Sequence, residues 1–446
     1  MNKQTILMHW EKFLAFEEEN HLFQLKEDGL YIWDILRFPV YLDYMWENFR
    51  NQTPRQKLRT KLKLSVTRLA YLVTFLFSRS RPNLFLTNSR DKTPDGHFYD
   101  KNADDFLQRL HLDSHIIETY QVKARNYAYP VSLINPTSLF NWLYRLLHRK
   151  QDYSVLLEQI NSSLNLKWDN KTINWHLGHF KSEKLFYTLL FRFSKTKRVY
   201  VTQNGIQKAL FSAARDSGVQ SVEFQHGIID PGHIAYNYPA SIVSGAEIYV
   251  PDLLLTFSEF WTQDINYPVK KIIPAGNTVF ANVSAYHKEF NPQSKCIGFI
   301  SSDVFGLKIS KLATEYAALN DKDNILFKLH PNEFAMKSFY DETFRDFPNI
   351  RVITNEQPTE EVILSCDAIV LIQSTIAYQA LQAGIRLFIY KRMTYYRHAH
   401  IFNSPNVRLI DNARQIVVTS DNTRDARDVF FEEFDESVYH HLSNPT

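Results

Sequence analysis

Residues 222–236, VEFQHGIIDPGHIAY, place polar and titratable side chains at the end of an expected strand. The candidates for contact with a substrate are Glu223, Gln225, His226, Gly227, Asp230 and His233. A histidine beside a carboxylate is the usual arrangement for general-base chemistry, so His226 and Glu223 are candidate catalytic residues. Gly227 allows the backbone to turn tightly or to approach a ligand closely. Two other interpretations stay open: a metal site that uses both histidines and Asp230, and a purely structural turn.

A second group of polar residues lies in FKLHPNE, residues 327–333. His330 follows an expected strand, and Pro331 stops that strand and fixes a turn. The imidazole can donate to a phosphate or sugar oxygen, Glu333 adds polar reach, and Lys328 lies two residues earlier on the same strand face. These four residues are therefore candidates for binding a phosphorylated ligand. The alternative is a histidine that only caps the turn.

A third group is Ser374 and Thr375 in LIQSTIAYQALQAG, residues 371–384, where a strand runs into a helix. Hydroxyl groups at this position cap the helix, while its free N–H groups and its dipole attract anions such as phosphate. An ordinary helix cap is the alternative interpretation. The sequence has no GxxxxGK[ST] loop, which argues against a P-loop nucleotide hydrolase.

The elements that must position these groups form an alternating pattern from about residue 82 onwards. Strands are expected at 82–89, 114–121, 198–204, 221–227, 270–277, 295–303, 324–333, 349–356, 366–374 and 385–392. Helices are expected at 206–218, 307–320, 333–346, 358–365 and 375–384. Strands alternating with helices predict βαβ units and parallel sheets. Ligands bind beyond the carboxyl ends of such strands, which is where all three groups lie.

The length of 446 residues exceeds one ordinary core, so two domains are expected. The pattern predicts an α/β fold of two Rossmann-like domains that face an interdomain cleft. The first domain is assigned to residues 1–250 and the second, which would bind the phosphorylated ligand, to residues 251–446. The two cysteines lie in apolar runs and predict buried, reduced thiols in a cytoplasmic protein.

Residues 55–81 carry eight Lys or Arg residues and no acid, with leucines at helical spacing. Such a basic amphipathic segment predicts peripheral binding to an anionic membrane surface. The alternative is a core helix with a solvated basic edge. The N-terminus lacks the apolar region of a signal peptide, and no run of 18 apolar residues exists, so no membrane span is predicted. The polar strand ends in both domains do not fit a nucleic-acid binder.

Together the motifs QHG, HP and ST, in this order, resemble bacterial glycosyltransferases with the GT-B fold that build capsule and lipopolysaccharide O-antigen chains. Residues 22–41 also look like the opening of such proteins, with Asp28-Gly29, Ile32-Trp33 and Leu36-Arg37 at their spacing. The acid-rich residues 87–106 look like their acceptor-side loop. Teichoic-acid-type CDP-glycerol phosphotransferases share parts of the pattern, but they usually show WHG where this chain has QHG.

The resemblance implies transfer of a sugar from a nucleotide-sugar donor to a growing surface polysaccharide, with a lipid-linked or oligosaccharide acceptor. The nucleotide sugar is a co-substrate, and no cofactor or metal is expected, because no convincing DxD motif is present. Under this reading the base is His226, Glu223, or an acid of the acceptor-side loop such as Asp91 or Asp95. The alternatives are a CDP-glycerol or polyol-phosphate transferase and a non-catalytic scaffold. The expected location is the inner face of the cytoplasmic membrane.

Overall fold

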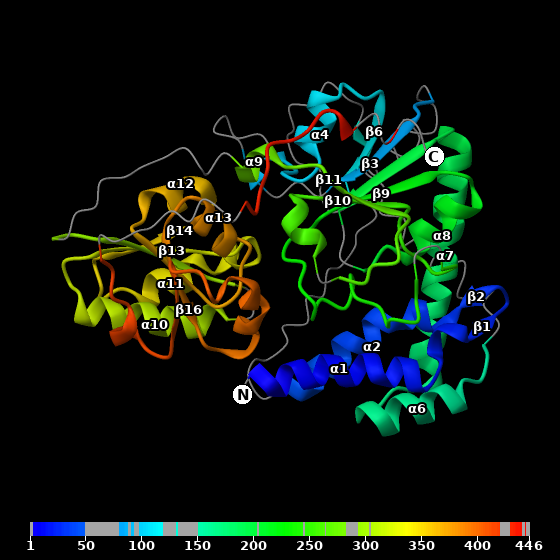
Figure 1. Cartoon of the computed structure of the whole chain (residues 1–446), viewed down its shortest axis with the longest axis horizontal. Coiled ribbons are helices and arrows are strands. Elements are labelled where there is room, and N and C mark those ends of the chain that lie inside the picture. The colour runs from blue at the N-terminus through cyan, green and yellow to red at the C-terminus, as the bar shows by residue number, and fades with distance from the viewer. Residues whose placement is uncertain are drawn as a thin grey trace.

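The structure is a computed structural model of the chain, and it consists of two α/β units with a further group of helices near the N-terminus (Figure 1). It describes residues 3–49, 80–87, 91–92, 98–118, 131–132, 150–202, 205–243, 246–263, 265–281, 293–302, 305–419, 429–438 and 442. The basic segment 55–81 lies outside these ranges except for residues 80 and 81.

The first sheet has seven parallel strands in the order β11-β10-β9-β8-β3-β6-β7. Their bounds are β3 Asn83–Thr87, β6 Ser114–Glu118, β7 Val131–Ser132, β8 Arg198–Thr202, β9 Gln220–Phe224, β10 Leu253–Thr256 and β11 Lys271–Pro274. The chain starts in the middle with β3, runs outward to β7, and then returns to β8 on the other side of β3. The strand order therefore reverses between β3 and β8, which makes that point the switch point of the sheet.

The second sheet has six parallel strands in the order β14-β13-β12-β15-β16-β17. Their bounds are β12 Cys296–Ile300, β13 Asn324–Lys328, β14 Ile350–Ile353, β15 Ala368–Leu371, β16 Arg386–Tyr390 and β17 Val407–Ile410. The order is that of a dinucleotide-binding Rossmann sheet, with its switch point between β12 and β15. The architecture is thus α/β and GT-B-like, with two Rossmann-like units, as the sequence predicted.

Helices cover both faces of each sheet because the strands are apolar on both sides. Helices α7 (Asn170–Ser194) and α8 (Lys208–Asp216) pack on one face of the first sheet, and α4 (Asp104–Arg109) packs on the other. In the second unit, α10 (Gly306–Leu319) and α11 (Lys337–Thr343) share a core on one face, while α12 (Thr359–Ser365) and α13 (Ile376–Gln382) lie on the other.

The remaining elements are short or lie near the chain ends. They are α1 Lys3–Glu19, η1 Leu22–Gln24, β1 Lys26–Glu27, β2 Leu30–Tyr31, α2 Ile32–Phe49, β4 Asp91–Lys92, β5 Phe98–Tyr99, α6 Ser154–Leu164, η3 Glu259–Thr262, α9 Thr278–Ala281, η5 Pro331–Met336, η6 Met393–Ile401 and η7 Ala413–Gln415. Among the described residues, no helix combines the length and the apolar character needed to cross a membrane.

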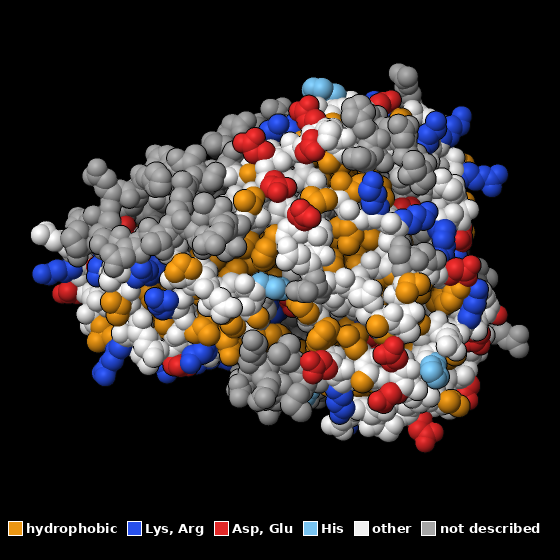
Figure 2. Space-filling view, viewed as in Figure 1, with side chains coloured by type: hydrophobic (Ala, Val, Ile, Leu, Met, Phe, Trp, Pro, Cys, Tyr) orange, Lys and Arg blue, Asp and Glu red, His pale blue; other side chains and the backbone are white. Residues whose placement is uncertain are grey.

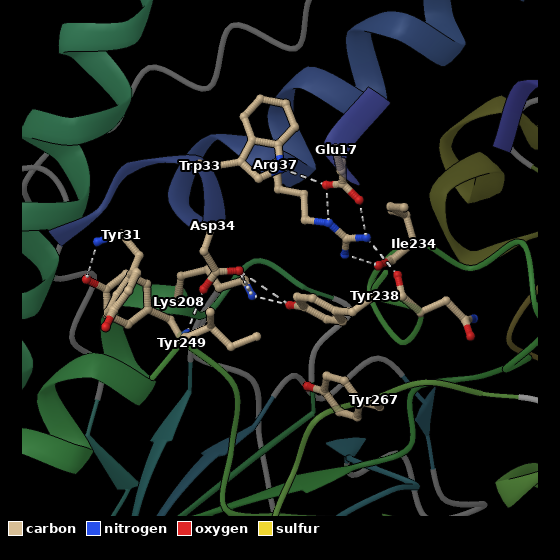
Figure 3. Close-up of polar contacts among 12 residues, drawn as sticks. Glu17, Tyr31, Trp33, Asp34, Arg37, Lys208, Ile234, Tyr238, Tyr249 and Tyr267 are labelled. Carbon is tan, nitrogen blue, oxygen red and sulfur yellow. Dashed lines mark hydrogen bonds and ion pairs between the residues drawn. The ribbon is translucent and has the colours of Figure 1, made fainter. Parts of the chain in front are cut away.

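A buried polar network joins the N-terminal helices to the loop after β9 (Figure 3). Arg37 of α2 donates from Nε to Glu17 at 2.6 Å, and also to the carbonyls of Ile234 and Asn237. Trp33 donates to the same Glu17 carboxylate at 2.7 Å. Trp33 and Arg37 belong to the opening motif singled out in the sequence. That motif therefore holds the loop after β9, here called the QHG loop, through hydrogen bonds to its backbone carbonyls.

The first sheet extends beyond the predicted domain boundary at 250/251, because β10 and β11 pair next to β9. A strand that follows a boundary region can join either sheet, and only long-range pairing decides which. The C-terminal segment also returns to the first unit, where Phe434, Val438 and Leu442 pack with α4 against the first sheet. In Figure 1 this segment, in red, runs along the first unit.

We predict that Gly276→Ala destabilises the protein more than Gly29→Ala does. Both glycines have a positive φ, 73° and 75°, so alanine strains the backbone equally at each, by about 1–2 kcal/mol. A Cβ at Gly29 meets nothing within 4 Å, whereas at Gly276 it collides with the backbone carbonyl of Glu433. The urea midpoint should therefore fall further for Gly276→Ala, and proteolysis should cut the C-terminal segment faster. Equal midpoints would contradict the close packing of that segment.

Candidate functional site

A cleft lies between the two units at the carboxyl ends of both sheets. It has a volume of about 600 Å³, which is in the range of small-molecule sites. Figure 2 shows hydrophobic side chains along the junction of the two units, with histidine among them. Thr87 and Thr202 line the cleft from the two strands that flank the first switch point. Both units therefore present the place where Rossmann sheets bind ligands.

The cleft brings together residues from all three sequence motifs. From the first unit His226 lines it, and from the second unit Lys328, His330, Pro331, Ser374 and Thr375 do so. The two units approach closely here, since a Cβ added to Gly227 would lie 3.4 Å from Thr375 Oγ1. His226 is exposed at the tip of the turn after β9. The predicted convergence of QHG, HP and ST thus exists in the structure.

His330 is oriented by the backbone of the short helix η5. Its Nδ1 accepts from the N–H of Asn332 at 3.2 Å, and Glu333 completes a capping box by accepting from the N–H of His330. Because Nδ1 acts as an acceptor, the neutral ring carries its proton on Nε2. His330 therefore both caps the turn, as the alternative interpretation held, and lines the cleft as a hydrogen-bond donor.

Ser374 begins the turn that leads from β15 into α13. Its Oγ accepts from the N–H of Ile376 at 3.3 Å, and its own N–H donates to His398 Nε2 at 3.2 Å. The hydroxyl of Thr375 makes no capping bond to this helix, although Thr375 is the N-cap residue. Ser374 therefore shapes the turn, and Thr375 presents its hydroxyl towards the opposite unit.

Lys328 lines the cleft, and its ammonium group donates hydrogen bonds to a neighbouring loop. It is 5% exposed, and its Nζ donates to the carbonyls of Thr354 and Gln357, the latter at 2.6 Å. These two carbonyls fix the ammonium group in position. Lys328 thus supplies a fixed positive charge at the end of β13.

Glu223 and Gln225 are fully buried and do not line the cleft. Glu223 accepts hydrogen bonds from the hydroxyls of Tyr236 at 2.9 Å and Tyr267 at 2.7 Å. Gln225 accepts from the N–H of Phe257 and donates to the carbonyl of Gly227, both within 2.9 Å. The structure therefore gives Glu223 and Gln225 the task of holding the turn rather than contact with a substrate.

Glu333 is also buried away from the cleft, where it accepts from Ser301 at 2.7 Å and from Tyr340 at 2.6 Å. Asp230 and His233 lie in the next turn of the chain, packed against the second unit. Asp230 forms an ion pair with Arg397 at 2.7 Å, and burial, followed by Arg397, holds the pKa of His233 well below its usual range. These residues shape the site without lining it.

Of the two acceptor-loop acids, Asp91 starts β4, which pairs with β5 in a small antiparallel hairpin. Its side chain and the whole of Asp95 lie outside what the structure describes, so their proposed role as a base stays a prediction. Asp104 and Asp105 begin α4. Within the described ranges, no group of three or more His, Cys, Asp or Glu side chains could hold a metal ion.

Several residues that line the cleft were not among the individual candidates from the sequence. They are Thr202, Gln207, Asn355, Thr359 and Gln379, together with Thr87, Asp100, Lys101 and Asn102, which fall within the predicted acceptor-side loop 87–106. Thr87 and Thr202 end strands that were expected, so the topology of the first sheet could have identified them. Lys101 could not be found in this way, because it lies in a loop whose position depends on Asn277 Nδ2 donating to its carbonyl at 2.8 Å.

No protein-family model and no curated protein sequence matches the chain. Solved structures resemble it at low identity. The UDP-GlcNAc 2-epimerase of Methanocaldococcus jannaschii, in complex with UDP-GlcNAc and UDP, has a TM-score of 0.47 and 13% identity, over 81% of this chain and 99% of that chain. MurG of Acinetobacter baumannii has a TM-score of 0.41 and 10% identity, over 75% and 87%.

The wall teichoic acid polymerase TagF is similar at the same level, with a TM-score of 0.41 and 10% identity, over 85% of this chain and 86% of that chain. At such scores these likenesses assign the chain to no family, and they carry no inference about its activity.

We predict that acid weakens folding through histidines that stay neutral in the native state. Burial lowers the pKa of His398 to about 3 and that of His176 to about 4. The unfolded chain binds protons at these residues near a pKa of about 6.5 while the native protein does not. The free energy of unfolding should therefore fall as pH drops below about 6.5, by up to about 1.4 kcal/mol per pH unit and residue.

Urea denaturation between pH 7 and pH 5 measures this effect. His398→Gln should reduce the pH dependence, because it removes one of the buried groups. His400→Gln is the matched control, since His400 is exposed on the same helix η6. An identical pH dependence for wild type and His398→Gln would contradict the prediction.

Proposed function

We propose that the protein is a glycosyltransferase that transfers a sugar from a nucleotide-sugar donor to a growing bacterial surface polysaccharide. The observation that carries the proposal is the opposition of His226, from the first unit, to His330, Ser374 and Thr375, from the second, across one cleft. Sugar transfer needs two substrates held in register, one with a phosphate leaving group and one with a nucleophilic hydroxyl. In a cleft between two Rossmann-like units, each unit can bind one of the two substrates.

The second unit fits the donor. The Nε2–H of His330 and the hydroxyl of Thr375 are hydrogen-bond donors, and Lys328 lines the same cleft with a positive charge. Preorganised donors and cations of this kind stabilise the negative charge that develops on a leaving diphosphate. In this proposal Pro331 keeps the His330 turn in shape, and the nucleotide sugar is a co-substrate rather than a resident cofactor.

The first unit fits the acceptor. His226 is exposed in the turn after β9, and the buried side chains of Glu223 and Gln225 hold the start of this turn in place. A histidine that reaches an acceptor hydroxyl can take up its proton as the new bond forms, which makes His226 the proposed general base. Lys101 and Asn102 line the same side of the cleft and are placed to contact the acceptor.

The acceptor is proposed to be an oligosaccharide on a lipid carrier at the inner face of the cytoplasmic membrane, where the protein would bind peripherally. Support comes from the sequence of the basic segment 55–81, whose charge would favour an anionic lipid surface. A peripheral attachment would bring the cleft to a substrate that cannot leave the bilayer.

A matched pair of substitutions tests the division of the cleft. His330→Asn keeps an acceptor for the N–H of Asn332 but removes the Nε2 donor, so we expect donor affinity to fall about 10- to 100-fold. His226→Asn should leave donor affinity unchanged and slow transfer about 10²- to 10⁴-fold. Thermal stabilisation by CMP, UDP, GDP, CDP and TDP, their sugars and CDP-glycerol measures binding in both variants.

Stabilisation of the wild type by one nucleotide sugar, lost in His330→Asn alone, would support the assignment. Stabilisation by CDP-glycerol alone would replace sugar transfer with polyol-phosphate transfer. Absence of a shift with every nucleotide would count against the proposal, and equal effects of both variants on donor binding would remove the division between the units.

Membrane attachment is tested separately by charge reversal of Lys57, Arg59, Lys61 and Lys63 to Glu. The variant should no longer sediment with vesicles that contain anionic lipids, because each of these residues contributes about 1 kcal/mol at the surface. Wild-type protein with neutral vesicles is the control. Unchanged sedimentation of the variant would refute a role for this segment.

A further inference from the structure

Consecutive residues of helix η6, Met393–Ile401, contact both the first unit and the cleft motif. Arg397 donates from Nε to Asp230 Oδ2 at 2.7 Å, and its Nη2 lies 2.7 Å from the same oxygen. The next residue, His398, accepts from the N–H of Ser374. Neighbouring side chains of one short helix thus touch the QHG loop and the ST motif.

The first-unit end of this connection is a rigid turn built around Asp230. Its Oδ1 accepts from the N–H of Gly232 at 2.9 Å, and its backbone carbonyl accepts from the N–H of His233 at 2.8 Å and from Asn237 Nδ2 at 2.8 Å. Because the Asp230 side chain is hydrogen-bonded within its own turn, a displacement of this side chain displaces residues 230–233 together. That turn follows the exposed His226 by four residues.

The second-unit end is equally constrained. His398 is fully buried, and burial, followed by Arg397, lowers its pKa to about 3, so that Nε2 stays available as an acceptor. The ring packs 5.6 Å from that of Tyr378 on α13. The direction of the His398 ring therefore sets the position of the Ser374 backbone at the start of the ST motif.

We propose that Arg397 is a positioning residue that couples the 230–233 turn to the Ser374 backbone through the adjacent His398. The coupling fixes how far His226 and Gly227 lie from Ser374 and Thr375 across the cleft. An ion pair suits this task because Arg397 and Asp230 are directional partners that tolerate one arrangement, whereas apolar contacts between the units could slide. The consequence for transfer rests on the proposed function; the coupling itself does not.

Hydrogen exchange of backbone amides, followed by mass spectrometry of peptic peptides, tests the coupling without any substrate. In Arg397→Gln we expect exchange at least about tenfold faster in both residues 228–236 and residues 373–378, while β13 is unchanged. Asp230→Asn should reproduce the effect from the other unit. Arg392→Gln is the matched control, because Arg392 lies next to the same helix and, among the described residues, donates within the second unit, to Tyr390, Lys391 and Asp411.

Faster exchange in the 228–236 peptide alone would overturn the coupling, as would the same change in Arg392→Gln. A variant that leaves an unpaired buried charge can fail to fold. The double variant Asp230→Asn with Arg397→Gln removes both charges, and it should show the same two accelerated segments, with no further acceleration over the single variants. Protection at the wild-type level in this double variant would refute the proposal.

Transfer kinetics supply the second readout. A positioning role predicts a kcat lowered about tenfold or more in Arg397→Gln with the KM for the donor within about twofold, because misplacement across the cleft affects the reacting geometry more than donor binding. Accelerated exchange with unchanged kcat would refute the role in transfer. If the wild type transfers nothing from any donor, the proposed function fails while the exchange result still decides the coupling.

Discussion

The buried guanidinium of Arg37 is the interaction on which the geometry of the cleft depends. The loop after β9 has no strand partner for much of its backbone, and Arg37 satisfies the carbonyls of Ile234 and Asn237 while pairing with Glu17. Buried carbonyls without a partner are costly, and removing one member of a buried ion pair costs about 3–5 kcal/mol. The N-terminal helices therefore hold the loop after β9 in place, although none of their described residues lines the cleft.

Two sheets with the same winding order explain why distant motifs meet. In each sheet the chain starts at the centre, moves outward and returns to the opposite side, which leaves a gap between connections at the carboxyl ends of the central strands. The gaps of both sheets open into one cleft. Gly227 and Thr375 then come within contact distance, although 148 residues separate them in the sequence (375 minus 227). Small residues at this junction let the units approach closely.

Much of the fold and part of the site could be predicted because they follow from local pattern. Apolar runs predict the strands, Pro331 predicts the end of one strand, and Ser374 predicts the start of a helix. Polar residues just past the end of a strand lie at the edge of the sheet. Glu223 shows where this reasoning stops. Its two carboxylate oxygens accept hydrogen bonds from Tyr236 and Tyr267, and the positions of these tyrosines depend on long-range packing. Likewise, β10 was not among the strands expected from the sequence, and pairing with β9 places it in the first sheet.

His226, His233, His330 and His398 divide into two classes according to what surrounds each ring. His398 is fully buried and His233 is partly buried, and burial, followed by the positive charge of Arg397, lowers the pKa of both. They serve as neutral rings that pack and accept. His226 and His330 line the cleft instead, where a phosphorylated ligand would bring negative charge. The same residue type thus packs beside a cation at one end of the QHG loop and faces the open cleft at the other.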